Sequence, residues 1–210
     1  MVAVVTDNGA NIVKAIKDFT PFRQIPCFAH TLNLAVTDAL KDSSNLSVLL
    51  EKCRKIVTYL KKSGPASAKL TLLSGNSTQK KLKQEVATRW NSSFFMLQSL
   101  LDLQQPVNDA LVLLKPELKL EDVDWVVISE ILSVLAPFEE ITRDLSSQYL
   151  PSVSKAIPAA RELQIELDTL QCSSIDAILF KDDLRDNIRR RFANIESSTP
   201  LLITTYLDPR

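Results

Sequence analysis

Residues 2–16 read VAVVTDNGANIVKAI, and this stretch decides the fold. Its β-branched apolar first half predicts a strand over residues 2–6, and its second half has the spacing of a helix. Asp7 lies at the junction, where many enzymes that transfer phosphoryl groups of nucleic acids hold a metal ion. Such a centre needs two or three converging carboxylates. No other acidic residue of this chain follows a comparable strand, so Asp7 stands without partners.

Asp7 has a second interpretation as a helix cap. Aspartate is among the preferred N-cap residues, and its side chain could accept a hydrogen bond from the amide of Ala10 or Asn11. The local pattern favours capping over metal binding, and it leaves both open.

The composition favours helices and gives no net charge. Only three glycines occur in 210 residues, none after Gly75, and 45% of the residues are hydrophobic. Scarce glycine argues against tight hairpins, and the apolar content supports a real core. The 25 basic and 25 acidic residues cancel. Any binding of nucleic acid must therefore depend on local basic runs, namely residues 52–62, 80–83 and 189–191, although interleaved acidic residues make solvated faces the commoner interpretation.

The cysteines indicate the redox environment of the protein, and the apolar stretches show whether it could cross a membrane. Cys27, Cys53 and Cys172 are an odd number, widely spaced, with no signal peptide before them. This pattern is typical of reduced thiols in the cytosol or nucleus. Charges interrupt every apolar stretch well before the length of a membrane span, so we expect no membrane partner. No pattern indicates a small-molecule substrate.

Apolar residues at three- and four-residue spacing predict an antiparallel array of helices with more than half of the residues helical. Residues 63–83 are expected to be mostly loop with some marginal helix, and residues 83–88 to form a short strand beside residues 2–6. Asn91 is the expected N-cap of the next helix. The predicted helices cover residues 8–20, 28–40, 46–60, 91–105, 107–114, 121–147, 151–170 and 174–192.

Two further clusters contain side chains that could bind a metal ion or a nucleic acid. Cys27 and the single histidine, His30, are three residues apart, but zinc needs three or four ligands and no other ligand lies nearby in the sequence. We therefore expect no metal here, but a buried His30 that is hydrogen-bonded to the loop of Asp7. Arg89 and Trp90 could meet a phosphate and stack on an unpaired base. Trp90 is equally a core anchor beside a helix cap, and the local chemistry favours the core.

Three motifs together resemble one family. They are VVTDNGANIVKAI at residues 4–16, PCFAHTLNLAV at residues 26–36 and VATRWNSSFFML at residues 86–97. In this order and spacing they resemble the core of hAT-family transposases and of the zinc-finger BED proteins derived from them. PFEEITRDLSSQYLPSVSKAIP at residues 137–158 and TTYLDPR at residues 204–210 resemble the helical insertion region of the same family.

The resemblance implies roles for particular residues. Asp7 matches the second acidic residue of a DDE triad in an RNase H-like core, here vestigial. Cys27 and His30 match the CxxH motif, a structural element, and Arg89-Trp90 match an RW pair that handles DNA. The resemblance places the first Asp and a BED zinc finger before Met1, and the Glu after Arg210. Mg²⁺ would be expected only for a complete triad, so no cofactor is expected in this chain.

The sequence therefore predicts a mostly α protein with a partial RNase H-like α/β core of one or two strands and an all-helical insertion domain. The predicted domains are residues 1–90 (partial core), 91–200 (helical insertion) and 201–210 (return to the core). Both ends look cut, and we expect a nuclear, catalytically incomplete transposase-derived protein that is not an enzyme. DNA, a transposase-like protein or a second copy is the expected partner. The alternative is a helical protein–protein interaction module without DNA activity.

Overall fold

The computed structural model describes residues 3–75, 81–86, 89–145 and 153–209, and helices contain 79% of this described part. The predicted mostly α fold is confirmed. The chain forms two compact units, each discontinuous in sequence. Unit 1 contains residues 1–39, 136–170 and 182–210, and unit 2 contains residues 40–135 and 171–181. The predicted domain boundaries at residues 90 and 200 come from the family resemblance and stay a prediction.

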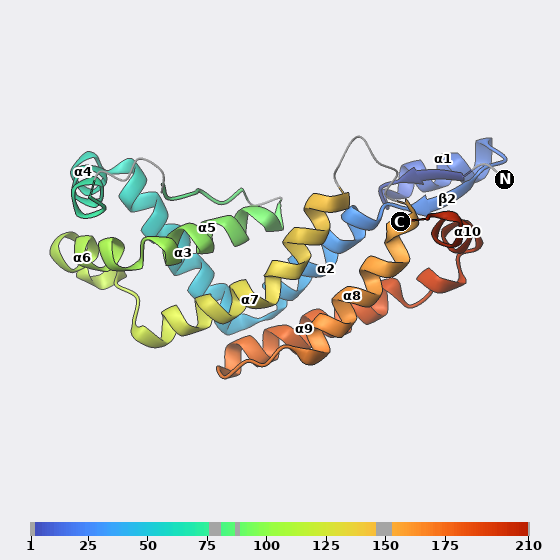
Figure 1. The fold of residues 1–210 in the computed structure, drawn as a ribbon. Helices are drawn as coiled ribbons and strands as arrows, with labels where there is room; N and C mark the ends of the chain where they lie inside the picture. The colour runs from blue at the N-terminus through green and yellow to red at the C-terminus, as the bar shows by residue number, and fades with distance from the viewer. Residues whose placement is uncertain (1–2, 76–80, 87–88, 146–152, 210) are drawn as a thin grey trace. The chain divides into compact units, whose positions relative to one another are not determined.

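Unit 1 begins with a strand, a helix and a second strand (Figure 1). These are β1 (Ala3–Thr6), α1 (Ala10–Phe19) and β2 (Arg23–Pro26). The strands pair in parallel, with Ala3 opposite Arg23 and Thr6 opposite Pro26. A parallel pair cannot be joined by a tight turn, so α1 serves as the crossover between its strands. The strand predicted from the opening motif is thus confirmed over its described residues.

The predicted second strand, residues 83–88, is wrong over its described part, because residues 83–86 are irregular. Residues 87–88 lie outside the described residues. Side chains of the following helix satisfy this backbone instead: Lys83 N donates to Ser99 Oγ (2.9 Å), and Val86 N donates to Ser92 Oγ (2.8 Å). A segment bonded in this way has no need of a strand partner. The strand that pairs with β1 is β2, a short segment between two predicted helices in which the sequence analysis predicted no strand.

The other elements of unit 1 are helical. They are the first part of α2 (Phe28–Asp42), the end of α7 (Asp122–Leu145), η2 (Val153–Lys155), α8 (Ala156–Thr169), the end of α9 (Ile175–Phe192), η3 (Ile195–Ser197) and α10 (Thr199–Leu207). Ile25, Ala156 and Leu201 form a buried cluster that joins β2, α8 and α10. The rings of Phe28 and Phe192 stack with their centroids 4.6 Å apart.

Unit 2 contains helices and irregular segments, and no strand, in its described part. It contains α3 (Ser44–Lys62), α4 (Gly64–Leu73), α5 (Trp90–Asp102), α6 (Gln104–Leu114), η1 (Pro116–Leu118) and the first parts of α7 and α9. The inner face of α3 is fully buried, as its spacing predicts, at Leu46, Leu50, Cys53, Ile56, Val57 and Leu60.

Two local predictions in unit 2 differ from the structure. Residues 64–73 form a helix rather than a loop, because Ser63 Oγ accepts the amide of Ala66 and Pro65 occupies the first turn, both of which favour a helix start. The next helix begins at Trp90 with Arg89 at the N-cap, so Asn91 lies in its first turn instead of capping it. Both differences concern helix ends, where capping by side chains decides the start.

Glu130 of α7 holds the start of α9 within unit 2. Its carboxylate accepts hydrogen bonds from the amides of Ser173 (2.8 Å) and Ser174 (2.9 Å), and from both serine hydroxyls. Burial acts to raise the pKa of Glu130, but these hydrogen bonds lower it to about 2. The ionised carboxylate therefore fixes the beginning of α9 on α7.

Candidate functional site

Asp7 lies exposed in the loop that follows β1. Its Oδ1 accepts a hydrogen bond from the amide of Gly9 (3.2 Å), and Gly9 is the N-cap of α1. The predicted bond to the amide of Ala10 or Asn11 is wrong, because the helix begins at Ala10, two residues later than a cap at Asp7 requires. Asp7 instead forms a local turn of the kind in which an aspartate bonds the backbone two residues ahead.

A short hydrogen-bond chain joins this loop to the start of α2. The amide of Cys27 donates to the carbonyl of Thr6 (2.7 Å), which continues the pairing of the strands by one residue. Thr31 Oγ1 donates to the carbonyl of Cys27 (3.0 Å), and Asn8 Nδ2 donates to Thr31 Oγ1 (3.2 Å). These contacts position the CxxH segment against the carboxyl end of the sheet.

Asn8 and Thr31 thus make the bridge that the sequence analysis assigned to His30. Cys27 and His30 are both partly buried. Thr31 could have been suspected from sequence, since a threonine at the fourth position of a helix often bonds a carbonyl one turn earlier.

The described residues contain no group of three or more His, Cys, Asp or Glu side chains that could hold a metal ion. Cys27 and His30 supply at most two ligands, fewer than a structural or catalytic zinc site uses. Within the same residues, no helix is long and apolar enough to cross a membrane.

Arg89 and Trp90 have different environments. Arg89 is exposed at the N-cap of α5, whereas Trp90 is 3% exposed and its ring meets that of Phe94 edge-on, with centroids 6.5 Å apart. An indole in this position could stack on a base only if it left the core. The role of the pair at DNA stays a prediction, and the structure gives Trp90 a role in packing.

Several basic residues of α3 are engaged within unit 2. Lys52 pairs with Asp124 (3.1 Å), and Lys61 Nζ donates to the carbonyl of Leu82 (3.2 Å). Arg54 pairs with Glu85. Burial acts to raise the pKa of Glu85, but the hydrogen bonds from Arg54 and Ser93 lower it overall.

The basic run at the end of α9 is engaged in the same way within unit 1. Arg189 pairs with Asp168 (3.3 Å), and Arg191 pairs with Asp38. Arg190 donates to the side-chain carbonyl of Asn187 (2.6 Å). These partners make the run part of the fold and reduce the positive charge it presents to solvent.

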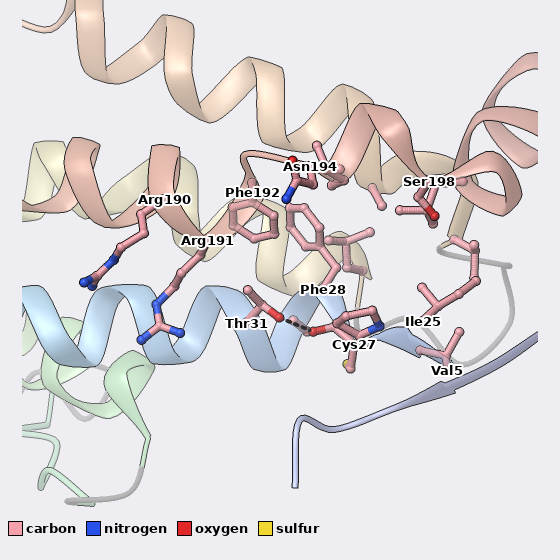
Figure 2. Close-up of a pocket in the computed structure, with 17 residues that line it drawn as sticks. Val5, Ile25, Cys27, Phe28, Thr31, Arg190, Arg191, Phe192, Asn194 and Ser198 are labelled. Carbon is pink, nitrogen blue, oxygen red and sulfur yellow. Dashed lines mark hydrogen bonds between the residues drawn. The ribbon is translucent and has the colours of Figure 1, made fainter. Parts of the chain in front are cut away.

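A cavity of about 360 Å³ lies in unit 1 beside the carboxyl ends of β1 and β2 (Figure 2). Val5 and Ile25 line it from the strands, Cys27 and Phe28 from the start of α2, and Phe192 from the end of α9. The sequence analysis missed this cavity because its walls come from five separated segments, and no local pattern shows that they meet.

A parallel strand pair with Asp7 after its first strand, a CxxH helix start and a mostly helical remainder fit the RNase-like helical class of transposase-derived proteins. Residues 25–134 match the family model described as the ZBED1 RNase-like helical domain, and the chain belongs to this family. The predicted resemblance is thereby confirmed.

Several relatives match over most of this chain. It is 30% identical to human zinc finger BED domain-containing protein 4 and 26% identical to human zinc finger BED domain-containing protein 6. Each of these matches covers 98% of the present chain. It is 28% identical to the transposable element Hobo transposase of Drosophila melanogaster over 90% of its length. The chain spans only 18%, 22% and 27% of these three relatives, respectively.

Proposed function

We propose that this chain is a catalytically incomplete, transposase-derived module of a nuclear protein, with contacts to DNA or to a transposase-like partner as its role. The observation that carries the proposal is the state of Asp7, whose carboxylate oxygen is used by the Gly9 amide in a local turn. The relatives support the setting, since they include BED zinc-finger proteins and a transposase.

The chemistry of a metal centre supports the same proposal. In two-metal phosphoryl transfer, carboxylates bridge ions about 3.5–4 Å apart, and the ions stabilise both the attacking and the leaving oxygen. A single aspartate can bind Mg²⁺ only weakly, because the ion keeps most of its water shell and needs further oxygen ligands. Asp7 acting alone would therefore leave the attacking and the leaving oxygen of phosphoryl transfer without stabilisation.

Metal-dependent DNA cleavage tests this proposal. The purified chain should show no cleavage or strand transfer with Mg²⁺ or Mn²⁺, and Asp7→Asn should not differ from the parent protein. Asp18→Asn is the matched control, since Asp18 is an exposed carboxylate on the neighbouring α1. Cleavage that is lost in Asp7→Asn and retained in Asp18→Asn would refute the proposal.

The pairing of the basic runs favours a second candidate, a helical protein–protein interaction module without DNA activity. Lys52, Arg54, Arg189 and Arg191 all have acidic partners within the chain. Residual DNA binding should be non-specific and fall steeply with salt, whereas an interface between helices should depend little on salt. Fluorescence anisotropy of labelled duplex DNA between about 50 and 200 mM salt separates the two. No binding even at the lowest salt would favour the interaction module.

A second copy of the chain is the remaining predicted partner. In the described residues β1 pairs only with β2, so its other edge carries no strand. Open apolar edges can pair with another chain. Size-exclusion chromatography with light scattering tests this, and a monomer at all concentrations would contradict it.

A further inference from the structure

The cavity of unit 1 lies where parallel sheets usually place ligands. In open α/β sheets, ligands bind beside the carboxyl ends of the strands, because the loops and helix starts converge there. Val5 and Ile25 contribute from the two strands, and Phe28 and Phe192 form a stacked aromatic wall. The volume of about 360 Å³ lies within the range of about 300–1,000 Å³ that small-molecule sites occupy.

The charged groups of the cavity do not lie at its aromatic wall. No acidic side chain is among the described residues that line it. Its two cationic residues, Arg190 and Arg191, are bonded to Asn187 and Asp38, respectively. Figure 2 shows both guanidinium groups directed away from the aromatic rings of Phe28 and Phe192. A charged ligand stacked on these rings would lose hydration without reaching a charged partner.

Two neutral polar side chains on the cavity are not committed to capping a helix. Asn194 is the N-cap of η3 and Ser198 is the N-cap of α10, and neither side chain makes the usual capping hydrogen bond. Asparagine and serine at this position normally accept from an amide of the first helical turn. Both residues line the cavity instead (Figure 2). By contrast, the Thr31 hydroxyl is already occupied by Cys27 and Asn8.

We propose that this cavity binds a small, uncharged, largely apolar aromatic molecule, with Asn194 and Ser198 as the groups that recognise its polar atom. An apolar wall with a few convergent polar groups is the usual composition of a small-molecule site. This site is independent of Asp7 and of DNA, so its test does not depend on the proposed function.

A pair of fluorescent probes tests the charge preference. N-phenyl-1-naphthylamine is neutral and apolar, and 1-anilinonaphthalene-8-sulfonate has the same scaffold with one negative charge. The neutral probe should bind the full chain saturably at one site, with a Kd of about 10–200 μM for a ligand of this size. The anionic probe should bind at least about tenfold more weakly, because both guanidinium groups of the cavity are directed away from its aromatic wall. Equal affinity for the two probes would overturn the proposal.

A filling variant tests the location. Ala29 lines the cavity from α2 and is half-buried, so Ala29→Trp should place an indole inside it. Binding of the neutral probe should weaken at least about tenfold, since one aromatic group would then occupy the space of the other. Ala68→Trp is the matched control, because Ala68 is exposed on α4 in unit 2. Unchanged binding by Ala29→Trp, with a helical spectrum like that of the parent protein, would overturn the assignment.

A double variant tests the polar recognition. Asn194→Ala with Ser198→Ala should weaken N-phenyl-1-naphthylamine about three- to tenfold, the usual range for lost hydrogen bonds. The isosteric 1-benzylnaphthalene has a methylene in place of the amine, and its affinity, measured by competition, should not change. An equal loss for both molecules would refute the role of Asn194 and Ser198.

Discussion

Replacing Trp90 by alanine distinguishes a packing role from a role at DNA. Trp90 is 3% exposed at the start of α5 and meets Phe94 edge-on. A side chain that stacked on bases would be expected at the surface, where its removal leaves the fold intact. A core anchor contributes to folding and leaves a cavity when it is removed.

The structure sets the size of the effect. Truncating a buried Phe or Trp to alanine costs about 3–5 kcal/mol, and the lost aromatic pair with Phe94 is part of that sum. Domains of this kind unfold with about 5–15 kcal/mol, so Trp90→Ala should remove a large fraction of the stability. Trp90→Phe keeps an aromatic ring and most of the buried area, and we expect a loss of about 1–2 kcal/mol.

Urea denaturation at neutral pH measures this loss. The chain contains two tryptophans, and the second, Trp125, is also buried in unit 2, so its fluorescence reports the unfolding of this unit in Trp90→Ala. Circular dichroism at 222 nm follows the helices independently. Arg89→Ala is the matched control, because Arg89 is exposed and should change stability by less than about 0.5 kcal/mol. A Trp90→Ala protein as stable as the parent would refute the packing role and favour the DNA role.

Two other sites give measurable predictions. Glu130→Gln should lower stability at pH 7 by about 1 kcal/mol, after allowance for solvent screening, because the amide cannot replace a carboxylate that accepts four hydrogen bonds. The lowered pKa of Glu130, about 2, means that this stabilisation is complete above the ordinary glutamate pKa and disappears as the pH falls from about 4 towards 2. The parent protein should therefore lose more stability than the variant over that range in acid titrations followed by circular dichroism. Burial raises the pKa of Cys53 to about 12, so iodoacetamide at pH 8 should leave it unmodified in the folded protein, and mass spectrometry should find it alkylated only after unfolding. Rapid alkylation of Cys53 under native conditions would show that α3 is not packed as described.

The helices and β1 were predictable because their signals are local. The apolar residues of α3 recur at helical spacing, and all of those from Leu46 to Leu60 that were assigned to its inner face are buried. Helix ends were less predictable. The start of α4 depends on the hydrogen bond from the Ala66 amide to Ser63 Oγ. The helix α5 begins at Trp90 with Arg89 as its N-cap, one residue before the expected cap.

The partner of β1 and the environment of the candidate residues depended on contacts between distant segments. The pattern of residues 83–86 allows a strand, but serines of α5 bond their backbone, and β2 pairs with β1 in their place. Likewise, Asn8 meets Thr31 because α2 starts against the end of the sheet, a contact 23 positions apart in sequence.

The sequence by itself determined the family, the helical class and the position of Asp7 after a strand, because apolar spacing, β-branched runs and short motifs act over a few residues. The tertiary structure alone decided that Trp90 is buried, that Asp168 and Asp38 pair with Arg189 and Arg191, and that five separated segments enclose a cavity with an aromatic wall. The physical reason is that burial, ion pairing and cavities depend on which surfaces meet. That choice follows from minimising exposed apolar area over a whole unit, and no short window of sequence contains it.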